Sequence, residues 1–131
     1  MELIKLSANE ALKMMEEGSL SSEEYVKAFL KQIELREDDV GAWIFLDPKL
    51  ALEQAREADK RWKDKTAGKL NGLPIGIKDI IDTKDMPTEN GSQLCKDRKP
   101  SKDAHLVKLL RNEGAVIMGK CVTTEFALSG P

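Results

Sequence analysis

The sequence has few of the features that mark specialised classes of protein. Its 131 residues include only two cysteines, Cys95 and Cys121, too few for a disulfide framework. The net charge is −2, so the composition gives no reason to expect nucleic acid or a membrane as a partner. No apolar run approaches the roughly 20 residues of a membrane span, and residues 1–5 lack the basic-then-apolar pattern of a signal peptide. These absences favour a cytoplasmic protein with reduced thiols.

What is present suffices for one hydrophobic core, since 40% of the residues are hydrophobic. The first half, residues 1–67, has helical patterns. Ser7 and Ser21 each precede a glutamate by three residues, and this capping-box spacing predicts two helices. Residues 42–46 are apolar and predict a strand or an extended segment. The Asp47-Pro48 pair then predicts the start of a third helix.

The second half, residues 68–131, alternates between strand and helix patterns. An apolar run over residues 73–78 predicts a strand, Ser101-Lys102-Asp103 predicts the cap of a helix that continues through Asn112, and residues 115–119 predict a second strand. A strand, a helix and a strand in this order predict a parallel βαβ unit. We therefore expect an α/β protein of one domain, with N-terminal helices packed on a small parallel core.

One lysine stands out because it closes an apolar strand. Lys78 follows Leu73-Pro74-Ile75-Gly76-Ile77 and would lie at the carboxyl edge of the parallel strands, where α/β proteins bind their ligands. Burial there would lower the pKa of the amine and make it a candidate base. The alternative is a lysine whose charged end simply extends into solvent.

Longer motifs around Lys78 resemble the amidase signature family. The matching segments are LNGLPIGIKDIIDT at 70–83, MPTENGS at 86–92, Asp103-Ala104 with Val107, GAVIMGK at 114–120 and TTEF at 123–126. The N-terminal helical patterns are also similar to the family's entry segment, so the resemblance covers essentially the whole chain. The resemblance implies a fragment of a large mixed sheet wrapped in helices. It also implies amide hydrolysis or transfer by a Ser–cis-Ser–Lys triad, with Lys78 as the catalytic lysine.

The serines of that triad have no counterpart in this sequence. In the family they lie in a Gly/Ser-rich stretch after the position of Pro131, so we expect a truncated amidase-like domain. Lysine without a nucleophile and oxyanion donors cannot form an acyl-enzyme. Apolar surface that the rest of the fold would cover is expected to be buried in a homodimer.

The same edge of the sheet holds candidate ligands for a metal that would supply a different nucleophile. His105 and Cys121, with a carboxylate from Asp79, Asp82 or Glu125, would follow or border the two parallel strands, and these groups are zinc ligands. Zinc there would supply metal-bound hydroxide. The alternatives are a solvent-facing histidine and a small buried cysteine.

Two functions follow from these observations. The first is hydrolysis of amide or peptide C–N bonds in a small substrate, dependent on zinc and on no organic cofactor. The second is a catalytically inactive fragment or docking subunit, and a variant of it has a second polypeptide that supplies the missing serines. The sequence does not identify the substrate.

Overall fold

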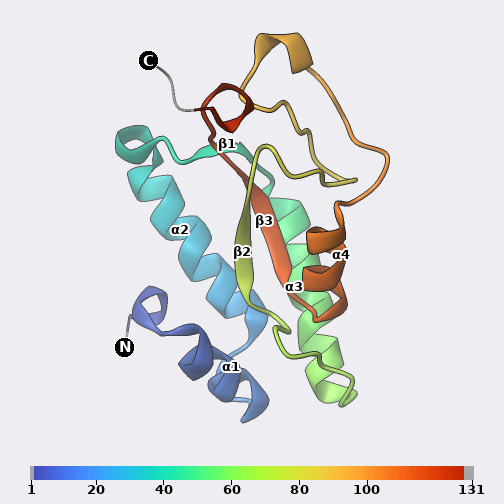
Figure 1. Ribbon diagram of the computed structural model, residues 1–131. Helices are drawn as coiled ribbons and strands as arrows, with labels where there is room; N and C mark the ends of the chain where they lie inside the picture. The colour runs from blue at the N-terminus through green and yellow to red at the C-terminus, as the bar shows by residue number, and fades with distance from the viewer. Residues whose placement is uncertain (1, 129–131) are drawn as a thin grey trace.

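The computed structural model describes residues 2–128 (Figure 1). Within these residues, three strands form one sheet and four α-helices pack around it. The helices are α1 (Ala8–Glu16), α2 (Ser22–Val40), α3 (Pro48–Lys63) and α4 (His105–Asn112), the strands are β1 (Trp43–Leu46), β2 (Pro74–Lys78) and β3 (Val116–Cys121), and three short 3-10 turns span Leu3–Lys5, Gln93–Cys95 and Glu125–Ala127. The expected α/β class, with N-terminal helices on a small βαβ core, is confirmed.

The capping signals place the first helices. Ser7 and Ser21 both form the predicted capping boxes, because each serine accepts a hydrogen bond from the backbone of a glutamate whose carboxylate reaches back. Asp47 caps α3, with Pro48 as its first residue. Gly41 ends α2 in the left-handed conformation (φ 60°), which glycine adopts without steric cost.

The predicted cap of α4 is wrong. The helix begins at His105 rather than after Ser101, and Ala104 occupies the N-cap position with no side-chain hydrogen bond. The carboxylate of Asp103 is used elsewhere: it accepts a hydrogen bond from the backbone of Lys84 (2.9 Å) and lies 3.1 Å from the guanidinium of Arg111. Tertiary contacts of this kind outweigh a local capping signal.

The sheet has the order β1-β3-β2, so the last strand in the sequence lies in the middle. β2 pairs parallel to β3, as the βαβ pattern predicts, and β1 pairs antiparallel on the other side. Every residue from Val116 to Lys120 is buried, which is the pattern of a strand covered on both faces. β1 and β2 each leave one edge unpaired within residues 2–128.

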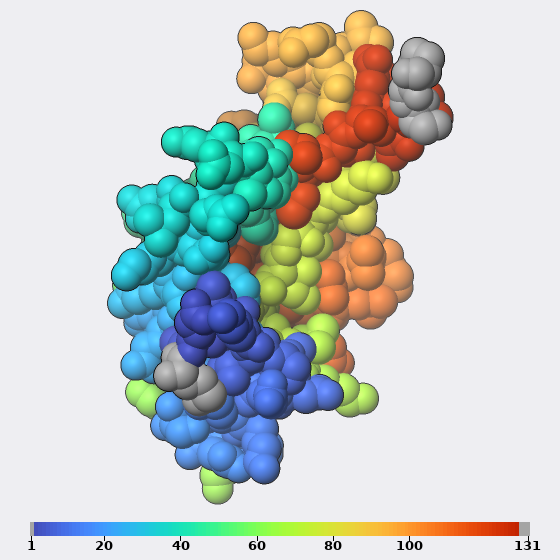
Figure 2. Space-filling model, turned by 90° about the vertical axis from the view of Figure 1, so that its left-hand side faces the viewer, coloured from blue at the N-terminus to red at the C-terminus, as the bar shows by residue number. Residues whose placement is uncertain are grey.

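Two apolar clusters cover the two faces of β3. On one face Val116 and Met118 pack with small residues of α3 and with Val26 of α2. On the other face Ile117 packs with Ile77 of β2 and Val107 of α4. Figure 2 shows α1 at one end of the molecule, while the loop after β2 and the segment after β3 lie together at the opposite end. Within residues 2–128, no helix is long and apolar enough to cross a membrane.

Candidate active site

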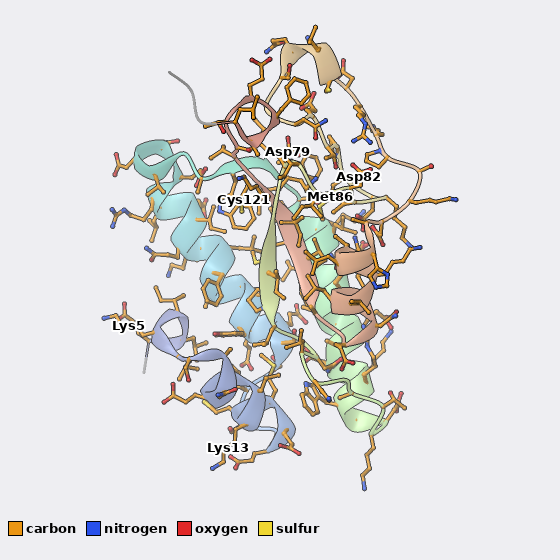
Figure 3. All side chains as sticks on the ribbon, in the orientation of Figure 1. Lys5, Lys13, Asp79, Asp82, Met86 and Cys121 are labelled. Atoms are coloured by element: carbon orange, nitrogen blue, oxygen red, sulfur yellow. The ribbon has the colours of Figure 1, made fainter. Side chains whose placement is uncertain are left out.

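The carboxyl edge of the parallel strand pair carries the polar residues that the sequence singled out. Lys78 and Cys121 are register partners at the ends of β2 and β3. The pairing extends one residue further, because the N–H of Asp79 donates to the carbonyl of Cys121 (2.9 Å). Figure 3 shows Asp79 and Cys121 near each other at this end of the sheet, with Asp82 and Met86 on the side of α4.

Lys78 is exposed, not buried, because it points to an uncovered face of the sheet; of the two interpretations of this lysine, the structure has the one that extends into solvent. Side chains alternate along a strand, so Ile77 enters the apolar cluster with Met86 and Val107, while Gly76 and Lys78 lie on the opposite face and are exposed. The ammonium of Lys78 has no hydrogen-bond or ion-pair partner among residues 2–128. Its charged end is therefore accessible to groups outside this segment.

Gly76 has no side chain, so two neighbouring side chains can approach the backbone of β2 beside Lys78. A Cβ atom at this position would come within 2.7 Å of the Cys121 sulfur and 2.9 Å of the Trp43 ring. The two side chains therefore lie directly against the backbone of β2. Burial raises the pKa of the Cys121 thiol, and the negative charge of Glu37 raises it further. The thiol is thus held in its neutral form beside Lys78.

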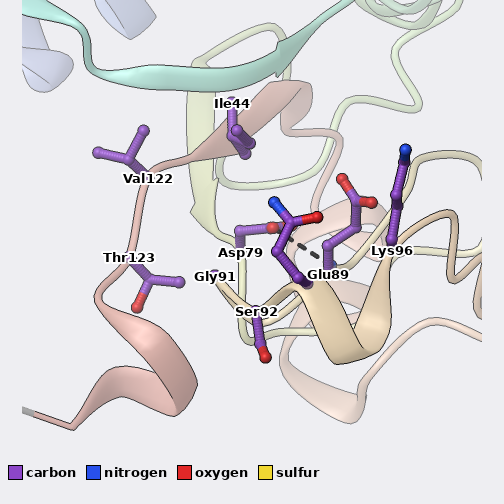
Figure 4. Close-up of a pocket in the computed structure, with 9 residues that line it drawn as sticks. Ile44, Asp79, Glu89, Gly91, Ser92, Lys96, Val122 and Thr123 are labelled. Carbon is purple, nitrogen blue, oxygen red and sulfur yellow. Dashed lines mark hydrogen bonds between the residues drawn. The ribbon is translucent and has the colours of Figure 1, made fainter.

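Asp79 turns to the other face and connects the strand to the following loop. Its side chain is 3% exposed, and one carboxylate oxygen lies 3.2 Å from the ammonium of Lys120. The other oxygen accepts a hydrogen bond from the N–H of Glu89 (3.2 Å; dashed in Figure 4). The carbonyl of Asp79 accepts from the N–H of Asn90 (2.9 Å). Asp79 is thus a shared contact of β2, β3 and the loop.

Lys120 is the residue that sequence reasoning missed. It directly follows the predicted strand at residues 115–119 and was given no role, yet its side chain is completely buried (0% exposed). Its ammonium donates to the Thr88 hydroxyl (2.6 Å) and to the Pro87 carbonyl (3.1 Å), in addition to its contact with Asp79. Burial lowers the pKa of Lys120, and Asp79 opposes this effect. A lysine directly after an apolar strand, with an acid at the end of the parallel partner, is the signal that would have found it.

An open cavity of about 410 Å³ lies at this edge (Figure 4). It is bounded by the start of β1, the loop after β2 and the segment after β3; its lining residues are Ile44, Asp79, Glu89, Gly91, Ser92, Gln93, Lys96, Val122 and Thr123. The Ser92 hydroxyl donates to the carboxylate of Glu125 (2.6 Å) and accepts from the N–H of Leu94. Its acceptor is a carboxylate, and no lysine or histidine of residues 2–128 bonds to the hydroxyl, so Ser92 forms neither a Ser–Lys nor a Ser–His pair.

The carboxylates expected to bind zinc have other partners. Asp79 contacts Lys120, and Glu125 accepts from Ser92. Asp82 accepts two hydrogen bonds from the guanidinium of Arg98 (2.7 and 3.0 Å). The Arg98 guanidinium holds the pKa of Asp82 below its usual value.

The expected zinc site is not formed within the described part of the chain. His105 is exposed at the first position of α4, and Cys121 lies against Gly76 on the face that carries Lys78. Across residues 2–128, no three His, Cys, Asp or Glu side chains group closely enough to hold a metal ion. Topology placed these residues near one edge, but their side chains point to different surfaces and partners.

Comparison of the chain with known proteins identifies a family. The family model described as Amidase matches residues 24–130. The chain belongs to the amidase family. This assignment confirms the resemblance seen in the motifs around Lys78.

Curated relatives in the amidase family are glutamyl-tRNA(Gln) amidotransferase subunits A. The chain is 36% identical over 127 residues to the subunit of Dehalococcoides mccartyi (strain BAV1) and 39% identical over 129 residues to that of Natranaerobius thermophilus. These matches cover 97% and 98% of this chain but 26% of either relative. The chain therefore spans about a quarter of the length of the curated relatives that it matches.

Solved structures of amidase-family enzymes share the fold over the same part. The peptide amidase of Stenotrophomonas maltophilia gives a TM-score of 0.86 at 32% identity, over 93% of this chain and 26% of that one. A fatty acid amide hydrolase gives 0.87 at 30% identity, over 92% of this chain and 22% of that one. The small mixed sheet and its helices thus match one portion of the larger fold of these enzymes.

Proposed function

We propose that this chain is the lysine-bearing part of a hydrolase that cleaves amide C–N bonds, with Lys78 at the reacting centre. The observation that carries the proposal is the position of Lys78. It lies at the carboxyl end of a parallel strand, on an uncovered sheet face, with an ammonium that has no partner in residues 2–128. Relatives named as peptide amidase and fatty acid amide hydrolase support an amide or peptide substrate.

In this proposal the amine of Lys78 acts as a general base and then as a general acid. The neutral amine accepts the proton of the attacking hydroxyl as the new C–O bond forms. The resulting ammonium returns a proton to the leaving nitrogen as the C–N bond breaks. No serine hydroxyl in residues 2–128 bonds to Lys78, so the nucleophile and the oxyanion donors come from groups outside these residues.

The proposal is tested by assaying the hydrolysis of small carboxamides and peptide amides, with the released ammonia as the measured product. Replacing Lys78 by methionine removes the proton-transfer group and should lower kcat/KM by about 10²- to 10⁴-fold. Lys49→Met is the matched control, because Lys49 is an exposed lysine on α3 rather than on a strand of the sheet. Equal activity in both variants would show that Lys78 is not at the reacting centre.

The alternative function is an inactive or docking segment, and the same assay separates it. Under that alternative the purified chain releases no ammonia, alone or with any added amidase-family chain that carries the Gly/Ser-rich stretch. Release of ammonia only in the mixture would instead support a second polypeptide that supplies the nucleophile.

Zinc dependence remains a prediction, and elemental analysis of the purified chain tests it. A site would need ligands from outside residues 2–128 or from a second copy, since the described residues provide no group of three. If zinc acts, chelation abolishes hydrolysis, and His105→Ala and Cys121→Ala each remove metal and activity. Cys95→Ala is the control that should retain both. Metal-free protein with full activity would end the zinc hypothesis.

A further inference from the structure

The buried ion pair behind the candidate active site has no role in the proton transfers proposed above. Lys120 is 0% exposed, and Asp79 is 3% exposed at its side chain. Burying two charges is costly, and a pair of well-packed apolar residues is often as stable or more stable. Stability alone therefore does not explain why the pair is buried, but the other contacts of Lys120 suggest a role for it.

The contacts of Lys120 converge on the segment that fixes Lys78. Its ammonium contacts Asp79, which is the residue next to Lys78. It also donates to Thr88 and Pro87 in the loop that covers the sheet edge. Thr88 is itself held by Arg98, whose backbone carbonyl accepts from the Thr88 N–H (3.0 Å). One ammonium thus joins the end of β2 to the loop above it.

The backbone of Lys78 is fixed on both sides by this arrangement. Ile77 precedes it and is buried, while Asp79 follows it and is bonded through its N–H, its carbonyl and its carboxylate. The carbonyl of Lys78 accepts from the N–H of Ile81 (3.0 Å). Only the side chain of Lys78 is free to move. Because Asp79 lies on the opposite sheet face, the pair holds Lys78 without touching its amine.

We propose that Lys120 is a positioning residue, which holds Lys78 at the sheet edge through its buried contacts with Asp79 and Thr88. This proposal rests on the proposed function of Lys78. It assigns no proton transfer to Lys120, which stays a buried cation throughout the reaction. Its effect is on the geometry of the strand end from which the reacting amine extends.

The experiment compares Lys120→Met and the smaller change Thr88→Val with the exposed control Lys60→Met. The first readout is the NMR signal of the Lys78 side-chain nitrogen and its adjacent carbon, assigned with Lys78→Arg. Both test variants should shift the Lys78 signals, and the control should not. Unchanged Lys78 signals in a folded Lys120→Met or Thr88→Val protein would overturn the proposal.

The second readout separates kcat from KM. A displaced base slows the chemical step, so Thr88→Val should lower kcat by up to about 100-fold and leave KM nearly unchanged. A change confined to KM would contradict positioning. If Lys120→Met does not fold, Thr88→Val decides alone, since it retains the ion pair. If the unsubstituted chain hydrolyses nothing, either alone or with an added amidase-family chain that carries the Gly/Ser-rich stretch, the proposed function fails. The NMR comparison still decides whether Lys120 positions Lys78.

Discussion

At the residue scale, the buried pair of Asp79 and Lys120 makes a sharp prediction about stability. Asp79→Asn leaves the ammonium of Lys120 buried without its countercharge, which should lower the free energy of unfolding by about 3–5 kcal/mol. Urea denaturation measures this change, and Asp38→Asn on the exposed side of α2 is the matched control. A loss no larger than that of the control would show that the buried ammonium is compensated by Thr88 and Pro87 alone.

The double variant Asp79→Asn/Lys120→Met tests the coupling between the two residues. Removing both charges leaves no uncompensated ion, so its loss of stability should be smaller than the sum of the two single losses. Additive losses would mean that the 3.2 Å contact contributes no interaction energy.

Individual residues also show where sequence reasoning worked. The position of Lys78 at the end of a parallel strand was predicted, because a strand pattern and a lysine at its end are local features. The burial of Lys120 was not, because it depends on Asp79 and Thr88, which lie far away in the sequence. The zinc ligands failed to group for the same reason: topology places residues at an edge, but their hydrogen-bond partners decide where the side chains point.

At the scale of helices and strands, the contact between α2 and α3 depends on charge. Glu23 in the first turn of α2 pairs with Arg56 of α3 (3.0 Å) and with Lys27 (2.8 Å). Hydrogen bonds from Arg56, and then from Lys27, lower the pKa of Glu23 to about 2. The folded state therefore stabilises the ionised form of the Glu23 carboxylate more than the unfolded state does.

This shift predicts a pH dependence. Because the pKa is lower in the folded state, the stabilisation by Glu23 is present above pH 4.5 and is lost as the pH falls towards about 2. Urea denaturation should show Glu23→Gln to be less stable than the original chain at neutral pH and equally stable near the lower limit. Glu34→Gln, at an exposed position of the same helix, should show no such trend. A constant difference across the range would contradict the prediction.

Local rules predicted these elements well. The capping boxes at Ser7 and Ser21 and the Asp47-Pro48 start each involve residues within one helical turn, so the sequence contains the whole interaction. The predicted start of α4 was wrong because the Asp103 carboxylate contacts Lys84 and Arg111 instead of capping the helix. No local pattern reveals these contacts. The antiparallel pairing of β1 with β3 also escaped prediction, since it joins distant parts of the sequence.

At the scale of the whole molecule, exposed apolar side chains point to association. Ile44 (54% exposed) and Val122 (48%) border the cavity, and Phe126 (45%) follows β3 at the same end. β2 also has an unpaired edge within residues 2–128. We propose that two copies of the chain bury this end of the molecule against each other. A stable interface of the obligate kind covers on the order of 2,000 Å² or more.

Light scattering at micromolar concentration tests the homodimer. The original chain should have twice the monomer mass of 14.6 kDa, and Val122→Lys should shift the protein to monomers. Leu35→Lys is the control, since Leu35 is also apolar and exposed but lies on α2. A monomeric original chain would rule out the dimer.

The central position of β3 has a consequence for how the chain folds during synthesis. β1 and β2 are both made earlier, yet each finds its hydrogen-bonding partner only in β3. Until the ribosome has released Cys121, neither strand can form its ladder, and the apolar faces of α2 and α3 have no sheet to cover. Pairings of such long sequence separation form slowly, because the intervening loop must be closed first. From the synthesis of β1 until that of β3, the nascent chain therefore has exposed strands, and chaperones would bind it in this interval.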